Sequence, residues 1–176
     1  YTNEGEIIAL RAINIKSGRL DLSKIKKIKK KVSNSLPRSK LYKNDIILSY
    51  TGTLGEVTII EENDKFHLAP NICLVRAKKI DPYYLYCFMK SNYFKNEIHK
   101  FTVGSTQKTI PMKNIRQLSI NIPEERYIKY TSYLIKKLEK KILLNEKKNE
   151  IFEKILTMLF KSWFIDFDPV RAKAEG

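Results

Sequence analysis

The sequence is poor in the residues that mark disordered, membrane-spanning and redox-active chains. Glycine and proline number only six each among 176 residues, and 43% of the residues are hydrophobic, which argues against disorder and allows a real core. No run of about 18 apolar residues occurs, so no transmembrane helix is expected. The two cysteines, Cys73 and Cys87, lack a Cys-x-x-Cys spacing and histidine partners. We therefore expect two reduced thiols in a cytoplasmic protein.

Patterns of catalytic residues are also missing. The only histidines, His67 and His99, lie in different segments, and no His-x-x-x-His, Gly-x-Ser-x-Gly or Walker-type pattern occurs. Asp166 and Asp168 have the spacing of metal ligands, but they follow a long helical pattern and precede a proline. A capping or partner-contact role fits that position better than a metal site. The sequence predicts a binding chain, not an enzyme, with no metal or cofactor of its own.

Acidic residues are scarce relative to basic ones. The chain has 34 Lys and Arg against 19 Asp and Glu, a net charge of +15 and a pI near 9.7. The segment at residues 16–43 contains eleven basic residues and one acid, Asp21. A concentration of one sign on part of a chain indicates a polyanionic partner such as nucleic acid. The alternative is that many of these lysines are simply solvated.

The last third of the chain has the pattern of one long helix. Residues 124–163 contain no Gly or Pro, and one stripe recurs at alternating steps of three and four, a period of 3.5 residues. Such a helix would be about 60 Å long and would need a partner along its length. The stripe consists of Ile128, Thr131, Ile135, Leu138, Ile142, Asn145, Asn149, Phe152, Leu156, Leu159 and Trp163.

Two features of the stripe bear on the partner. Asn145 and Asn149 occupy central positions, where a buried amide trades stability for a fixed register or partner number. Additional apolar residues beside the stripe make it broader than a two-stranded seam requires, which favours contact with more than one neighbour. The alternative is an ordinary amphipathic helix of a larger bundle.

The first 123 residues have the mixed periodicities of an α+β domain. Short apolar runs predict strands, and Asp81 followed by Pro82 predicts the start of a helix. The basic segment contains Pro37 and is expected to be irregular or to form a short helix with a loop. Residues 45–50 and 56–61 are expected to form a hairpin around a glycine-bounded loop. The expected strands lie at residues 6–15, 45–50, 56–61, 66–76 (interrupted near Pro70) and 117–122.

Four segments resemble the specificity subunits of type I restriction–modification systems. DIILSYTGTLG at residues 45–55 resembles their GDILLS…GTLG segment, and VGSTQKTI at residues 103–110 resembles their GSTQKHI loop. INIP at residues 120–123 stands where the family has IPIP, and LFKSWFIDFDPV at residues 159–170 is very similar to the family's LFKSWFVDFDPV. One departure is the absence of Gln from the P…EQ signature, where this chain has Pro123, Glu124, Glu125 and Arg126.

The resemblance implies a specific organisation. A full specificity subunit has two target-recognition domains, each followed by a conserved helix, and the two antiparallel helices hold the domains on the halves of a split DNA site. This chain corresponds to one half, so it is either a fragment or a half-subunit that pairs with a second copy. The implied parts are a recognition domain at residues 1–123, a dimerisation and spacer helix at 124–165, and a tail at 166–176.

The resemblance also implies the ligands and partners. Double-stranded DNA is the expected ligand, while modification and restriction subunits would bind S-adenosylmethionine and ATP and perform the chemistry. Basic side chains suit phosphate contacts, and polar loop residues suit base reading. A motif shared by members that read different sequences is, however, expected to shape the fold or face a partner. The candidate DNA contacts are Lys26, Lys27, Lys29, Lys30, Lys31, Arg38, Lys40, Ser49, Tyr50, Thr51, Ser105, Gln107 and Lys108.

Two other interpretations of the sequence stay open. One is a coiled-coil protein-interaction adaptor whose positive charge is incidental. The other is the recognition domain of a DNA methyltransferase whose catalytic part is absent, since the chain has no Asn-Pro-Pro-Tyr-like motif and no glycine-rich cofactor loop.

Overall fold

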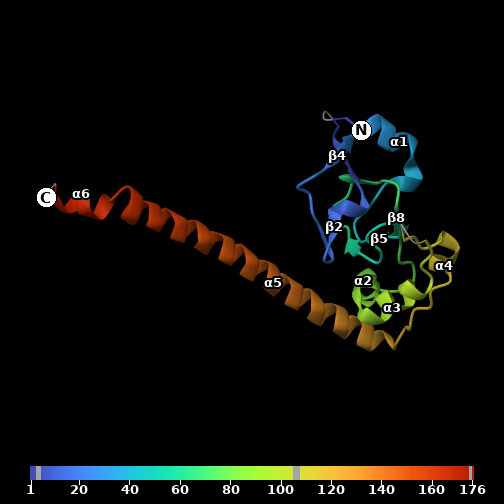
Figure 1. Cartoon of the computed structure of the whole chain (residues 1–176). Helices are drawn as coiled ribbons and strands as arrows, with labels where there is room; N and C mark the ends of the chain where they lie inside the picture. The colour runs from blue at the N-terminus through green and yellow to red at the C-terminus, as the bar shows by residue number, and fades with distance from the viewer. Residues whose placement is uncertain (3–4, 105–107, 175) are drawn as a thin grey trace. The chain divides into compact units, whose positions relative to one another are not determined.

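The computed structural model describes residues 1–2, 5–104, 108–174 and 176 (Figure 1). These residues form two compact units, Tyr1–Ser132 and Tyr133–Gly176. The first unit contains the strands, the short helices that precede the long helix, and the first two turns of that helix, which confirms the predicted α+β class. In the described ranges, no helix combines the length and apolar character needed to cross a membrane.

The first sheet has an N-terminal strand at its centre. Strand β1 (Ile7–Leu10) pairs antiparallel with β4 (Lys26–Ile28) and parallel with β7 (Phe66–Leu68). All four residues of β1 are buried, as expected for an apolar strand with a neighbour on each side. β4 was not predicted, because Lys-Lys-Ile has little strand propensity and becomes a strand only by pairing with β1. Its lysines lie on an edge of the sheet, where charge discourages further strand pairing.

A small hairpin follows β1. Strands β2 (Ile15–Lys16) and β3 (Arg19–Leu20) pair antiparallel. The turn between them has positive φ angles of 50° at Ser17 and 82° at Gly18, the combination found in two-residue hairpin turns. The hydroxyl of Tyr86 donates a 2.8 Å hydrogen bond to the Gly18 carbonyl. The position of this turn is therefore fixed by a buried contact with a later helix.

The second sheet is antiparallel and has β5 (Ile46–Ser49) at its centre. β6 (Val57–Ile59) and β8 (Ile72–Val75) flank it. β5 and β6 form the predicted hairpin. The first three residues of β5 are apolar because both faces of the strand are covered: Ile46 and Leu48 belong to one apolar cluster, and Ile47 belongs to the other.

The chain changes sheets between β7 and β8. Pro70 cannot donate a ladder hydrogen bond, and Asn71 has a φ of 73°, a left-handed conformation that asparagine tolerates well. The predicted interruption near Pro70 is thus confirmed. It separates two strands that belong to different sheets, so the prediction of a single interrupted strand at residues 66–76 is corrected.

Helices cover one side of the second sheet. Helix α2 (Pro82–Lys90) begins as predicted, because the Asp81 carboxylate accepts a 2.9 Å hydrogen bond from the backbone N–H of Tyr84. The predicted strand at residues 117–122 is wrong: within the described part of the chain this segment pairs with no strand, and it runs irregularly toward the long helix. The other short helices before it are η1 (Ala12–Asn14), α1 (Lys30–Ser35), η2 (Pro37–Ser39), α3 (Asn92–Lys100) and α4 (Met112–Arg116).

The long helix is α5 (Glu125–Phe160), which has 36 residues and a length of about 54 Å at 1.5 Å per residue. The predicted helix at residues 124–163 is therefore confirmed over most of its length. Beyond it, η3 (Lys161–Ile165) is wound as a π-helix, and α6 (Asp168–Ala174) occupies the expected tail. The Ser162 hydroxyl donates a 2.7 Å hydrogen bond to the Asp168 carboxylate. Across the described ranges, no cluster of three or more His, Cys, Asp or Glu could hold a metal ion.

Candidate nucleic-acid interface

The predicted phosphate-contacting lysines gather on β4 and the start of α1. Lys26 is in β4, Lys29 is the residue before α1, and Lys30 and Lys31 form its first turn. All four side chains are exposed, whereas Lys27 is half-buried. Lysines are unfavourable at a helix N-terminus, because the helix dipole places partial positive charge there. These lysines therefore do not stabilise α1. Their exposed ammonium groups form a positive surface that a polyanion can contact.

The basic segment is attached to the first sheet by buried polar contacts. Ser33 of α1 lies with its hydroxyl oxygen 3.1 Å from Nδ1 of His67 in β7, and both residues are buried. Burial, and then the charge of Lys40, lowers the pKa of His67. The backbones of Lys40 and His67 also form an isolated antiparallel β-bridge. This anchor was not predicted, although a histidine inside an apolar strand is a signal of a buried hydrogen-bonded side chain.

A second buried anchor ends the basic segment. Asp45 is buried and accepts two hydrogen bonds from Arg76, at 2.7 Å to Nε and 2.6 Å to Nη2. The backbone N–H of Tyr42 donates to the same carboxylate at 2.8 Å. The hydrogen bonds from Arg76 raise the pKa of that guanidinium. Together these contacts fix the turn that leads into β5.

The first glycine loop is shaped by Ser49. This residue is fully buried; its hydroxyl donates to the Thr53 carbonyl and accepts a 3.1 Å hydrogen bond from the backbone N–H of Glu56. A buried hydroxyl with both roles occupied offers nothing to a base, so the prediction of a DNA contact at Ser49 is corrected. Tyr50 is half-buried against the apolar cluster beneath the helices, and it too contributes to the fold.

The first glycine loop, which follows β5, lies against residues 108–110, although more than fifty residues separate the two segments in the sequence. Residues 108–110 end the motif that begins at Val103, which is called the second glycine loop here. Oγ1 of Thr51 lies 2.7 Å from Oγ1 of Thr109, and the N–H of Gly52 donates a 3.2 Å hydrogen bond to the Lys108 carbonyl. The N–H of Ile110 donates to the Tyr50 carbonyl at 2.9 Å. The structure thus brings Thr51 and Lys108 to one composite loop, where Lys108 is exposed.

Other predicted contacts lie elsewhere. Ser105 and Gln107 fall outside the described residues. Arg38, in η2, is exposed, and Lys40 just after it is half-buried. The lysines belong to β4 of the first sheet and to α1, whereas Thr51 follows β5 of the second sheet and Lys108 lies between α3 and α4. The candidate interface therefore consists of two groups, one made mainly of charge and one made of polar loop residues.

The stripe on α5 is covered at its beginning and exposed beyond it. Ile128 is buried within the first unit, which corrects its assignment to a helix–helix interface, and Thr131 and Ile135 are half-buried. Leu138 is 55% exposed and Leu156 is 66% exposed, so both residues are accessible to a partner. The other exposed stripe residues are Ile142, Asn145, Asn149, Phe152, Leu159 and Trp163.

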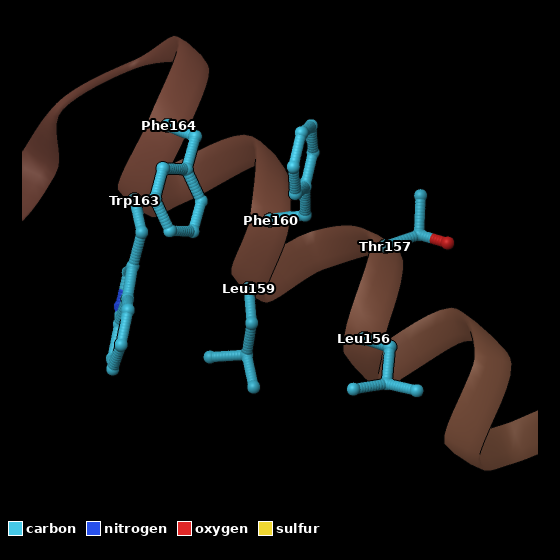
Figure 2. Close-up of a pocket in the computed structure, with 6 residues that line it drawn as sticks. All are labelled: Leu156, Thr157, Leu159, Phe160, Trp163 and Phe164. Atoms are coloured by element: carbon cyan, nitrogen blue, oxygen red, sulfur yellow. The ribbon is translucent and has the colours of Figure 1, made fainter.

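The C-terminal end of the stripe is its most apolar part. Figure 2 shows Leu156, Leu159 and Trp163 on one side of the helix, with Phe160 pointing to another side. These residues, together with Thr157 and Phe164, line a shallow apolar hollow. Contiguous exposed apolar surface of this kind marks an interaction site.

The comparisons with known proteins agree with this architecture. The model of a family described as the type I restriction modification DNA specificity domain matches residues 1–154. The HindI specificity subunit of Haemophilus influenzae is 38% identical over 103 residues, which cover 57% of this chain and 22% of that protein. The EcoBI specificity subunit of Escherichia coli is 25% identical over 116 residues, which cover 65% of this chain and 24% of that protein.

Solved structures show the same fold. The type I restriction–modification S subunit from M. genitalium matches with a TM-score of 0.65 and 17% identity, over 93% of this chain and 39% of that one. The HsdS subunit from Thermoanaerobacter tengcongensis matches with a TM-score of 0.60 and 14% identity, over 89% of this chain and 41% of that one. The chain thus spans less than half the length of these relatives. It belongs to the type I restriction–modification DNA specificity domain family, as its four motifs predicted.

Proposed function

We propose that this chain is a non-catalytic DNA-recognition component of a type I restriction–modification complex and that it reads one half of a bipartite site. The observation that carries this proposal is the match of the family over residues 1–154 together with the exposed lysines of β4 and α1. Lysines contact phosphates without regard to sequence, so this surface positions the domain on the duplex.

Base reading is assigned to polar side chains on loops, which form the second group of the candidate interface. Thr51 and Lys108 are held together by the contact between the two glycine loops, so they present polar groups on a defined scaffold. Ser105 and Gln107, which precede Lys108 in the sequence, stay candidates for base contacts. Arg38 and Lys40 extend the phosphate-contacting surface from the basic segment. This division follows the general rule that phosphate contacts orient a protein and base contacts specify the sequence.

The partners follow from the exposed stripe of α5. The stripe binds an apolar helix, which belongs either to a second copy of this chain or to the other half of a longer subunit. S-adenosylmethionine and ATP would be bound by the modification and restriction subunits, and this chain would supply neither site. The domain boundaries at residues 123 and 165 are part of the proposal.

The competing function is a helix-pairing adaptor, which the exposed stripe alone would also support. Binding of a labelled random duplex, measured by fluorescence anisotropy over a series of salt concentrations, separates the two. A DNA-recognition chain binds duplex with a log–log salt slope of several units, because each neutralised phosphate releases counterions. An adaptor shows no binding at low salt beyond that of an acidic control protein, and this result would overturn the proposal.

A further inference from the structure

Arg76 and Asp45 form an ion pair at one end of the second sheet. Ile46 of β5 pairs with Val75 of β8, so Asp45 and Arg76 lie opposite each other one residue beyond the ladder. The Asp45 carboxylate accepts hydrogen bonds from Nε and Nη2 of Arg76. The side chain of Asp45 is 3% exposed, whereas that of Arg76 is 49% exposed. The arginine is therefore the part of the pair that another molecule can reach.

An aromatic ring also holds the guanidinium of Arg76. Its Cζ lies 5.3 Å from the centroid of the Tyr42 ring, which is a cation–π distance. Tyr42 is fixed in turn, because its N–H donates to the Asp45 carboxylate and its carbonyl accepts a 3.0 Å hydrogen bond from the Asp45 N–H. A carboxylate and a ring thus restrict the orientation of an arginine that is exposed to solvent.

The contact with the carboxylate leaves one edge of the guanidinium for another acceptor. A guanidinium has five N–H donors in a fixed plane, and Asp45 engages the edge formed by Nε and Nη2 of Arg76. The edge formed by Nη1 and Nη2 has two parallel N–H groups, which match two neighbouring acceptors in one plane. O6 and N7 of guanine are such acceptors in the major groove of DNA, where arginine at guanine is the commonest specific contact.

We propose that Arg76 reads a guanine in the half-site, with Asp45 and Tyr42 as the residues that position it. The proposal rests on the DNA recognition proposed above and adds a base-contacting residue outside the two glycine loops. Tyr42 follows Lys40 by two residues and Arg38 by four. The arginine therefore lies beside the part of the basic segment that is assigned to phosphates.

The charge around Arg76 favours a base over a phosphate. The ion pair with Asp45 has no net charge, so its attraction for a phosphate is small, whereas donation to the neutral edge of a base does not require net charge. Lys78 and Lys79 follow Arg76 in the sequence. The turn at residues 61–64 contains two glutamates and an aspartate, and hydrogen bonds join its beginning to the residues just before Asp45. Both signs of charge thus surround the pair, unlike the lysine surface of β4 and α1.

The positions of these residues in the sequence agree with a reading role. A residue that reads a base has to differ among relatives with different targets, so it is expected outside the motifs that they share. Asp45 begins one of the four segments that resemble the family, whereas Tyr42 and Arg76 lie outside all four. The motif therefore supplies a fixed carboxylate, and the side chains that it orients come from other parts of the chain.

Neutralising the pair without changing the net charge tests this assignment. The double variant D45N/R76Q replaces both charges by amides, so neither partner is left as an unpaired buried charge. In selection of bound DNA from a random pool, with modification subunits present, the preference for guanine at one position of the half-site should fall about tenfold. Glutamine can pair with adenine, so a gain of adenine at that position is the same result. The log–log salt slope for a random duplex should be unchanged, because no phosphate contact is lost.

Two further variants separate the reading role from general effects. E62Q/K65Q neutralises the exposed 2.7 Å ion pair of the same unit, also at constant net charge, and should select the wild-type half-site. Y42L keeps the ion pair but removes the ring, and should weaken the same guanine preference severalfold. It should weaken nothing further in the D45N/R76Q background, because Tyr42 acts through Arg76. Y42F keeps the ring and should behave as wild type.

The possible outcomes distinguish this inference from the proposed function. An unchanged half-site in D45N/R76Q, or weaker binding of every duplex with a flatter salt slope, overturns the reading role of Arg76. A variant that fails to fold loses the preference at every position of the half-site. In that case Y42L decides, and an unchanged guanine preference in Y42L overturns the inference. A wild-type chain that binds no duplex overturns DNA recognition itself.

Discussion

The hydroxyl of Ser132 donates a 2.7 Å hydrogen bond to Oδ1 of Asp81, the same oxygen that accepts the N–H of Tyr84 at the start of α2. One carboxylate therefore caps α2 and holds the second turn of α5. Ile128, one turn earlier, is buried in the same unit. The first two turns of α5 thus belong to the first compact unit, and the part of the helix available to a partner begins after them.

Removal of the shared carboxylate should lower the stability of the first unit. Asp81→Ala should reduce the free energy of unfolding by about 1–2 kcal/mol, since loss of an N-cap alone costs about 1 kcal/mol. Asp81→Asn is the matched control and should lose only a few tenths, because asparagine caps equally well and can still accept from Ser132. Urea unfolding followed by circular dichroism measures both. Equal losses in the two variants would contradict the capping role.

A charge in the stripe should prevent helix pairing. Leu138→Glu places a carboxylate into apolar packing, at a cost of about 3 kcal/mol or more to the paired state. Sedimentation should show a dimer for the wild-type chain and a monomer for the variant. Lys140→Glu, on the solvated side of the same turn, is the control and should remain a dimer. A wild-type chain that is monomeric at tens of micromolar, with no partner present, would rule out self-pairing.

Neutralising the lysine surface should weaken DNA binding without changing its sequence preference. Four Lys→Gln changes on β4 and α1 should flatten the log–log salt slope by up to about 4, since each contacted phosphate contributes about 0.9. The changed residues are Lys26, Lys27, Lys29 and Lys30. The control carries four Lys→Gln changes, three on the face of α5 opposite the stripe, at Lys140, Lys147 and Lys154, and one at Lys161, the first residue of η3. An unchanged slope in the first variant would mean that β4 and α1 face solvent or protein.

The buried histidine should make stability depend on pH. Burial lowers the pKa of His67 in the folded state, so as pH falls below the ordinary histidine value of about 6.5 the unfolded chain takes up a proton first. This contribution to stability is complete above about pH 6.5 and is lost as pH falls through the lower folded pKa. His67→Gln should remove that part of the pH dependence of the urea midpoint. The exposed His99, changed to Gln, serves as the control and should leave the profile as in wild type.

The length of α5 should set the spacing of the two halves of the DNA site. Seven residues inserted between Leu138 and Phe152 keep the stripe nearly in phase and lengthen the helix by about 10 Å, close to three base pairs. Selection of bound DNA from a random pool, with modification subunits present, should then show a wider gap between unchanged half-sites. Two inserted residues should abolish assembly, because they rotate the stripe out of phase. A gap that stays constant after the longer insertion would show that α5 is not the spacer.

The features that depend on local pattern were predictable from the sequence. The stripe of α5, the β5–β6 hairpin and the cap at Asp81 each follow from residues close together in the chain, and the structure confirms all three. The family could also be identified, because its motifs are short continuous segments.

The features that depend on distant neighbours were not predictable. Lys26 and Lys27 are in a strand only because β1 offers an unpaired edge, whereas residues 117–122 are apolar and alternating but have no edge to join. Helical periodicity places Ile128 on the stripe, yet it cannot show that the recognition domain covers that position. Ser49 looked like a polar loop residue, and only the return of the chain at Glu56 shows that its hydroxyl is enclosed.

The exposed stripe of α5 has a consequence for the DNA itself. If two copies of this chain pair through the stripe, the pair has a two-fold axis, and the two copies of one recognition domain present identical reading surfaces in opposite orientations. Such an assembly selects an inverted repeat, in which the same bases recur on the two strands. If the partner helix carried a different recognition domain, the two half-sites would be unrelated in sequence. The choice of partner for one helix would thus decide whether the target is a palindrome.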